Sequence, residues 1–190
     1  MRILITGHSI PNALETQYLK YLNELGNEVV IFPTADIFQN YYHRSLLNKI
    51  IVRLNISGIF KRINKQLIEE IDRFNPDCLL VFKGTEILPR SILYANQKNI
   101  LTANYNPDNP FIFISYGNGK RNISKTITTY RCHFTYNLET AKILKKINPN
   151  TFVIPFGVNS TATEKDILPE QSEKLKVCFY GGPDKKRYEF

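Results

Sequence analysis

Short apolar runs alternate with amphipathic segments along the chain as far as residue 154. The runs are rich in leucine and β-branched residues, which is typical of buried parallel strands. They predict strands at residues 2–6, 28–32, 77–82, 100–103, 131–136 and 151–154. Apolar residues at helical spacing predict helices at 13–25, 46–54, 56–74, 123–130 and 138–147, and another that starts at residue 89. This alternation predicts an α/β fold with a doubly wound parallel sheet.

Three segments between the predicted strands and helices have sequence patterns that predict their local structure. Asn12 followed by Glu15 has the spacing of a capping box, so we expect these two side chains to start the first helix. Residues 33–42 follow a proline stop and hold three aromatic side chains, and we expect a loop there. Residues 117–121 contain two glycines and also predict a loop.

A stiff polar loop is predicted at residues 105–111, which read Tyr-Asn-Pro-Asp-Asn-Pro-Phe after the fourth strand. Two prolines remove backbone donors, while Asn and Asp favour tight turns. Ligands of open α/β sheets bind at the carboxyl ends of the strands. Asn106, Asp108 and Asn109 are therefore candidate binding residues. The alternative for Asp108 is that its side chain caps the turn that Pro107 begins.

Residues that could bind a ligand also follow two other predicted strands. The turn Gly7-His8 precedes a helix and can hold a polar or anionic group, although it lacks the G-x-G-x-x-G spacing of dinucleotide-binding proteins. Lys83-Gly84 follows the third strand and can meet a phosphate or a sugar hydroxyl. A charged residue at a tight turn is an equally good interpretation of Lys83.

Composition narrows the classes of partner. The net charge of +8 permits nucleic acid, anionic lipid or phosphorylated substrates, but no nucleic-acid motif accompanies the scattered basic residues. Three distant cysteines without C-x-x-C spacing predict buried free thiols, with neither a disulfide framework nor a metal site. No apolar run approaches the ~20 residues of a membrane span, and the N-terminus lacks signal-peptide features. We therefore expect a cytoplasmic protein without a transmembrane segment.

The end of the chain predicts a second domain. Residues 159–173 are polar and resemble an interdomain linker, and residues 174–190 hold a new strand that ends in Gly181-Gly182. A strand and half a turn cannot bury their own faces. We therefore expect a first domain at 1–158 and a truncated second domain from 174, or else a tail that docks on the first domain.

The order of these motifs resembles the N-terminal Rossmann-like half of a GT-B glycosyltransferase related to the spore maturation protein CgeB. The matching segments cover nearly the whole chain and are residues 1–7, 74–77, 80–84, 105–111, 133–137, 154–159 and 177–182, with Arg187. The resemblance implies two domains that face each other across a cleft, the first holding the acceptor and the second a nucleotide-sugar donor. It also implies that this bacterial-type chain is mainly the acceptor half, inactive without the rest.

The resemblance also implies roles for single residues. Gly181, Gly182 and Arg187 match a glycine turn and an arginine beside the donor diphosphate, where backbone donors and a guanidinium bind phosphate oxygens. Asp108 would orient an acceptor hydroxyl or act as base, with His8 as a second candidate. The substrate-binding set would be Gly7, Lys83, Gly84, Asn106 and Asn109. No D-x-D metal motif is present, so we expect no metal and no tightly bound cofactor, and a glycan, lipid-linked or protein acceptor.

Two other interpretations stay open. A non-catalytic flavodoxin-like or Rossmann-like binding domain would need an acidic cluster or a flavin-phosphate loop after the first strand, and residues 7–11 supply neither convincingly. A basic nucleic-acid-binding module would bind DNA or RNA with a steep dependence on salt.

Overall fold

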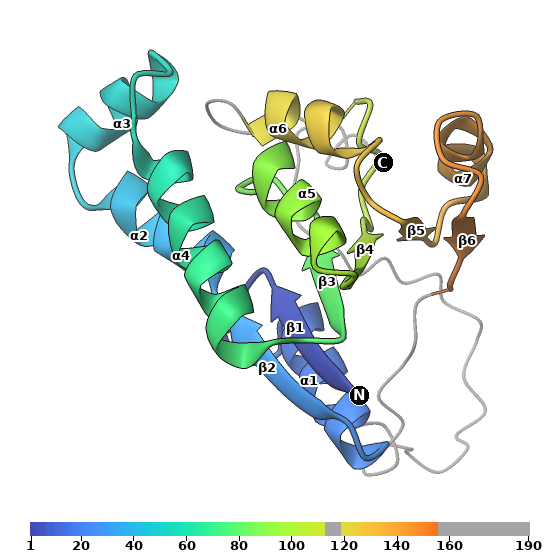
Figure 1. The fold of residues 1–190 in the computed structure, drawn as a ribbon. Helices are drawn as coiled ribbons and strands as arrows, with labels where there is room; N and C mark the ends of the chain where they lie inside the picture. Colours follow the sequence, from blue (N-terminus) through green and yellow to red (C-terminus); the bar gives the residue numbers. More distant parts are fainter. Residues whose placement is uncertain (113–118, 156–190) are drawn as a thin grey trace, which may run out of the picture. The chain divides into compact units, whose positions relative to one another are not determined.

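The computed structural model describes residues 1–112 and 119–155, which form a parallel sheet with helices on its two faces (Figure 1). The sheet order is β2-β1-β3-β4-β5-β6, and every neighbouring pair is parallel. The strands are β1 (Arg2–Thr6), β2 (Glu28–Phe32), β3 (Cys78–Phe82), β4 (Leu101–Tyr105), β5 (Cys132–Thr135) and β6 (Thr151–Val153). The α/β fold class and the six strands predicted from the sequence are confirmed.

Seven helices occur in the part of the chain that the structure describes. They are α1 (Leu14–Glu24), α2 (Thr34–His43), α3 (Leu46–Arg53), α4 (Ile59–Phe74), α5 (Pro89–Gln97), α6 (Gly119–Thr126) and α7 (Leu138–Lys145). Because side chains alternate along a strand, β1 and β3 supply both faces of the core. Leu4 and Leu79 pack with α4 and α5, whereas Ile5 and Leu80 pack with α1.

The strand order places a topological switch between β1 and β3. The chain leaves β1 toward β2 on one side and then returns past β1 to add β3 on the other. The crossovers that follow these two strands therefore diverge, which leaves a crevice at their carboxyl ends. In this sheet the crevice is at the turns that begin with Gly7 and Lys83.

Three local predictions are wrong. Residues 34–43 form helix α2, since Pro33 supports a helix start and Ala35, Phe38 and Tyr42 share one buried face. Helix α6 begins at Gly119 inside the predicted loop and ends before the predicted residue 130. The first helix is capped by Ala13, with no side-chain hydrogen bond from Asn12 or Glu15.

The described part of the chain also bears on the predictions for the cysteines, for membrane-spanning helices and for the end of the first domain. Within them, Cys78 and Cys132 are buried free thiols, and no helix is long and apolar enough to cross a membrane. The compact unit that contains the sheet runs from Met1 to Phe156. The predicted linker and second domain, with Gly181, Gly182 and Arg187, lie outside the described residues and stay predictions.

Candidate functional site

A cavity of about 220 Å³ occupies the crevice between the carboxyl ends of β1 and β3. Its walls come from the turn after β1, from α1 and α2, and from the turn after β3. The lining residues are Gly7, His8, Glu15, Ala35, Phe38, Gln39, Tyr42, His43, Phe82, Lys83, Thr85 and Glu86. The cavity therefore lies where the strand order alone predicts a ligand site.

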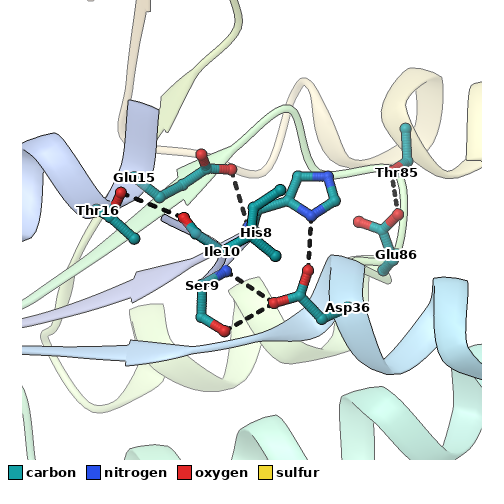
Figure 2. A network of polar contacts seen from close by, with 8 residues as sticks. All are labelled: His8, Ser9, Ile10, Glu15, Thr16, Asp36, Thr85 and Glu86. Carbon is teal, nitrogen blue, oxygen red and sulfur yellow. Dashed lines mark hydrogen bonds and ion pairs between the residues drawn. The ribbon is translucent and has the colours of Figure 1, made fainter. Parts of the chain in front are cut away.

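His8 and Asp36 form the central polar contact of this crevice (Figure 2). The imidazole Nδ1 lies 2.7 Å from Asp36 Oδ1, and the backbone N–H and hydroxyl of Ser9 each donate to Oδ2 at 2.7 Å. Burial acts to raise the pKa of the Asp36 carboxyl, but the hydrogen bonds from His8 and Ser9 outweigh it and lower the pKa below its ordinary value. Asp36 is therefore an ionised acceptor at neutral pH.

This contact fixes the tautomer of a neutral His8 ring. An ionised carboxylate can only accept hydrogen bonds, so the proton of a neutral imidazole is on Nδ1 and the lone pair is on Nε2. Figure 2 shows Nε2 on the side of the ring away from Asp36, toward Thr85 and Glu86. Both of these residues line the same cavity as His8. The arrangement presents a basic nitrogen to whatever occupies the cavity.

Glu15 holds the backbone of this turn. Its Oε1 accepts a hydrogen bond from the His8 N–H at 2.9 Å, and its side chain is buried. A Cβ at Gly7 would lie 2.3 Å from the same Oε1, so this close approach requires glycine. Glu15 thus anchors the turn after β1 instead of capping α1, which explains why the predicted capping box is absent.

Glu86 is a buried carboxyl on the opposite wall (Figure 2). Burial raises its pKa, and the hydrogen bond from the Thr85 hydroxyl opposes the rise only in part. The buried Asn64 amide fixes this turn because it donates to the Glu86 carbonyl at 2.7 Å and accepts from the Leu88 N–H at 2.8 Å. The wall after β3 therefore combines a backbone fixed by hydrogen bonds with a carboxyl whose pKa is raised by burial.

Lys83 joins the cavity to the loop after β4. Its backbone has a φ of 56°, and Gly84 follows at 89°, so two successive residues adopt left-handed conformations. The Lys83 ammonium lies 2.9 Å from Asp108 Oδ2, and both side chains are partly exposed. A Cβ at Gly84 would lie 3.0 Å from the Tyr130 hydroxyl, so Gly84 serves close packing beside the cavity and does not line it.

The loop after β4 uses most of its polar side chains on its own backbone. Asn106 Oδ1 accepts from the Asp108 N–H, and Asn109 Oδ1 accepts from the Phe111 N–H, both at 3.0 Å. These are turns closed by asparagine side chains. Neither asparagine nor Asp108 lines the cavity. Of the sequence candidates, the structure thus brings Gly7, His8 and Lys83 together and places Asp108 beside them through its ion pair.

Sequence reasoning missed three carboxyl groups of this site, those of Glu15, Asp36 and Glu86. Asp36 lies in the segment for which the sequence predicts a loop, so the pattern does not indicate a role for it. Its position after β2 is a usable signal, because the carboxyl ends of all strands in a parallel sheet lie at one edge. For Glu15, the spacing from Asn12 predicts a helix cap instead. Glu86 lies three residues after Lys83, at a spacing that gives no signal by itself.

Comparisons with known proteins identify the fold. No family model and no curated protein matches the chain. It is similar to the UDP-GlcNAc 2-epimerase from Neisseria meningitidis bound to UDP-GlcNAc, with a TM-score of 0.54 and 18% identity over 80% of this chain and 45% of that one. The epimerase from Methanocaldococcus jannaschii gives a TM-score of 0.57 and 13% identity over 81% and 45%. The S. aureus MnaA–UDP structure gives 0.54 and 18% over 86% and 50%.

These similarities show which fold the chain has and how much of each matched structure it covers. The chain spans about half the length of the structures that it matches. UDP-GlcNAc 2-epimerases share the GT-B fold with glycosyltransferases, so the Rossmann-like fold implied by the resemblance is confirmed. Membership of the CgeB-like family stays a prediction.

Proposed function

We propose that this chain is the acceptor-binding half of a GT-B enzyme that transfers a sugar from a nucleoside-diphosphate-sugar donor. The observation that carries the proposal is the His8–Asp36 pair in the cavity between β1 and β3. A base held by a carboxylate at a sheet edge is suited to removing a proton from a hydroxyl group. The fold of the solved nucleotide-sugar enzymes supports the same substrate class.

The geometry supports a direct displacement. The acceptor hydroxyl donates its hydrogen to His8 Nε2, and its oxygen forms a bond to the anomeric carbon of the donor sugar. The bond from that carbon to the diphosphate oxygen breaks, and the diphosphate leaves with the electron pair. Asp36 stabilises the imidazolium that forms, as the carboxylate does in other His–Asp pairs. One displacement of this kind inverts the anomeric configuration.

The remaining walls suit a single sugar ring. The cavity, at about 220 Å³, is smaller than the roughly 300–1,000 Å³ of sites for drug-sized ligands. Phe38, Tyr42 and Phe82 offer apolar surface to a ring face, while the side chains of Thr85 and Glu86 can hydrogen-bond to its hydroxyls. We assign the Lys83–Asp108 pair to the rim of the acceptor site, and Asn106 and Asn109 to the loop that supports it.

The donor would bind to the second domain. Gly181, Gly182 and Arg187 have the residue types that bind a diphosphate through backbone donors and a guanidinium. In this proposal the chain needs a complete second domain for turnover. Its own cavity supplies the acceptor site and the base.

Epimerisation of the donor sugar is a second candidate, because the solved structures of similar fold that we report include UDP-GlcNAc 2-epimerases. The two activities differ in their products. The full-length enzyme would be incubated with a panel of UDP- and other nucleotide-sugars, with and without sugar acceptors. Release of nucleoside diphosphate and the configuration at C1 and C2 would be followed by proton NMR.

We expect release of nucleoside diphosphate only when an acceptor is present, together with formation of a glycoside of inverted configuration. A C2 epimer without an acceptor would favour the second candidate. His8→Gln should lower the rate of transfer at least about 10²-fold, whereas the control His43→Gln, which removes a histidine from the α2 wall of the same cavity, should change it much less. Turnover that is equal in wild type and His8→Gln would refute the assignment of the base.

A further inference from the structure

A surface at the outer end of α2, α3 and α4 combines apolar side chains with positive charge. Residues 37–68 contain no Asp or Glu but six Lys and Arg residues. Figure 1 shows α3 beyond α2 and α4, on the side away from the sheet.

The exposed side of α3 is apolar. Leu46, Leu47, Ile50 and Leu54 follow one side of the helix, and Ile56 continues the surface; we call these five side chains the α3 face. Between 53% and 77% of each residue is exposed. The helix already buries another side, where Val52 packs into the cluster formed with Phe38, Tyr42, Phe60 and their neighbours. The α3 face is therefore additional apolar surface that core packing does not explain.

Five cations lie on or near α3 in the sequence. Arg44, Lys49, Arg53, Lys61 and Arg62 come from α3 and the segments that flank it, and no salt bridge among the described residues joins them to a carboxylate. Lys49 lies over the Tyr42 ring, 5.8 Å from its centroid.

Residues of α2, α3 and α4 form a concave site in the same part of the fold. It is a cavity of about 570 Å³ lined by Arg44 and Arg62, with Asn40, Tyr41, Ser45 and Asn48. Two guanidinium groups with amide and hydroxyl donors form a set that binds phosphate oxygens.

We propose that the α3 face and this basic cavity bind the surface of a membrane that contains anionic phospholipids. The leucine and isoleucine side chains enter the boundary between headgroups and acyl chains, and the nearby cations attract the anionic headgroups. Arg44 and Arg62 take a lipid phosphate in the cavity. An exposed apolar helix face with cations close to it in the structure supplies the two contributions on which interfacial binding depends.

Other occupants explain less of the surface. A symmetric contact with a second copy of the chain would bring two sets of cations together without acidic partners, because residues 37–68 contain no Asp or Glu. Nucleic acid would use the cations but would leave five exposed aliphatic side chains without a role. An anionic lipid surface is complementary to both the charge and the apolar residues.

The membrane surface would lie close to the sugar cavity. Helix α2 lines the sugar cavity with Phe38 and Gln39 and the basic cavity with Asn40 and Tyr41. The two cavities therefore share one helix. Vesicle binding does not depend on the proposed transfer reaction, so the two proposals can fail separately.

Vesicle sedimentation tests the proposal with the full chain. We expect binding to vesicles of equal parts phosphatidylglycerol and phosphatidylcholine, and little binding to phosphatidylcholine alone. The double variant Leu46→Ser and Leu47→Ser should weaken binding by at least about tenfold, because full burial of one leucine contributes more than that factor. The control is Leu25→Ser with Leu138→Ser, which removes two leucines of similar exposure elsewhere and should leave binding unchanged.

The charge requirement is tested in the same assay. Arg44→Gln with Arg62→Gln should weaken binding about 25-fold, since each cation near an anionic surface contributes about fivefold. Lys145→Gln with Lys146→Gln removes the same charge from the end of α7 and is the matched control. Inorganic phosphate and duplex DNA serve as competitors.

Several results would overturn the proposal. These are equal binding to both types of vesicle, no loss in the leucine variant, or equal loss in each variant and its control. Displacement from vesicles by duplex DNA at equal phosphate concentration would identify a nucleic-acid surface. A dimer in sedimentation velocity that Leu46→Ser with Leu47→Ser abolishes would identify a contact between copies.

Discussion

The crevice after β1 and β3 and the loop after β4 are both polar and lie at the same edge of the sheet, but their side chains are used differently. In the loop, Asn106 and Asn109 bind backbone N–H groups two residues ahead of them. In the crevice, His8 contacts Asp36, which lies 28 residues away on another element. One ring nitrogen is thereby fixed, and the other is presented to a cavity.

This difference separates structural from functional polar residues. In an asparagine that closes its own turn, the side-chain oxygen already accepts a hydrogen bond from a backbone N–H. This oxygen is therefore less available to bind a ligand. A histidine held from behind by a carboxylate has an oriented group left to use. The partner of a polar side chain is therefore more informative than its residue type or its place at a strand end.

The largest expected effect is on turnover. In the full-length enzyme, His8→Gln should lower kcat by about 10²–10⁴-fold, the usual contribution of a general base. Asp108→Asn should change kcat by less than about tenfold, because its partly exposed ion pair with Lys83 contributes little. Steady-state kinetics of diphosphate release would measure both. The opposite ranking of the two variants would make Asp108 the base and would reverse the comparison.

Gly7→Ala should destabilise the fold by about 2–4 kcal/mol, as expected when a close contact is forced on a buried polar group. The new Cβ would lie 2.3 Å from Glu15 Oε1, so Glu15 must move and release the His8 N–H. Urea denaturation would measure the change.

The control for this variant is Gly58→Ala, whose Cβ would meet nothing within 4 Å. There the entropy gain and the poorer helix cap oppose each other, so we expect a change within about 0.5 kcal/mol. Removing the Glu15 side chain as well, with Glu15→Ala, should make the cost of Gly7→Ala smaller. Full additivity of these two changes would contradict the contact.

Much of the fold could be predicted from the sequence, because the spacing of apolar residues indicates where strands and helices lie. All six strands lie within about two residues of their predicted positions, and α3 and α4 match the long apolar stripes of residues 46–74. The failure at α2 has a physical reason. Its stripe of Ala35, Phe38 and Tyr42 is short and aromatic and starts directly after a proline, so it resembles a loop.

The site was less predictable because it is made by tertiary contacts. Gly7, His8 and Lys83 could be found from their places after strands, which the fold class brings to one edge. The contact of His8 with Asp36 depends on how α2 leaves β2, and the contact of Glu15 with the His8 N–H depends on the path of α1. No local pattern encodes either geometry.

The two carboxyl groups of the crevice should respond to pH with opposite signs. The pKa of Asp36 is lowered in the folded protein, so its stabilisation is present above the unfolded value of about 4 and is lost as the pH falls through the folded value. Asp36→Asn should therefore cost about 1–3 kcal/mol at pH 7, from lost hydrogen bonds to a charged group, and much less at pH 2.

Glu86 should show the reverse. Its pKa is raised by burial, so the stabilisation is present below the unfolded value of about 4 and is lost as the pH rises through the folded value. Glu86→Gln should increase the free energy of unfolding at pH 8 relative to wild type and leave it nearly unchanged at pH 3. Urea denaturation between pH 2 and pH 8 would measure both variants. Parallel pH profiles for Asp36→Asn and Glu86→Gln would show that the two walls do not differ as described.

The smallest effect is expected in the loop after β4, where Asn109→Ala removes the acceptor of the Phe111 N–H. A net hydrogen bond contributes about 0.5–1.5 kcal/mol, and the loss should appear in the free energy of unfolding. Asn109→Asp keeps the acceptor oxygen and should restore most of it. Because the cavity is not lined by Asn109, the affinity for a sugar acceptor, measured by calorimetry, should stay unchanged in both variants. A change in affinity without a change in stability would place Asn109 in contact with the ligand and give this loop the role that we assign to the crevice.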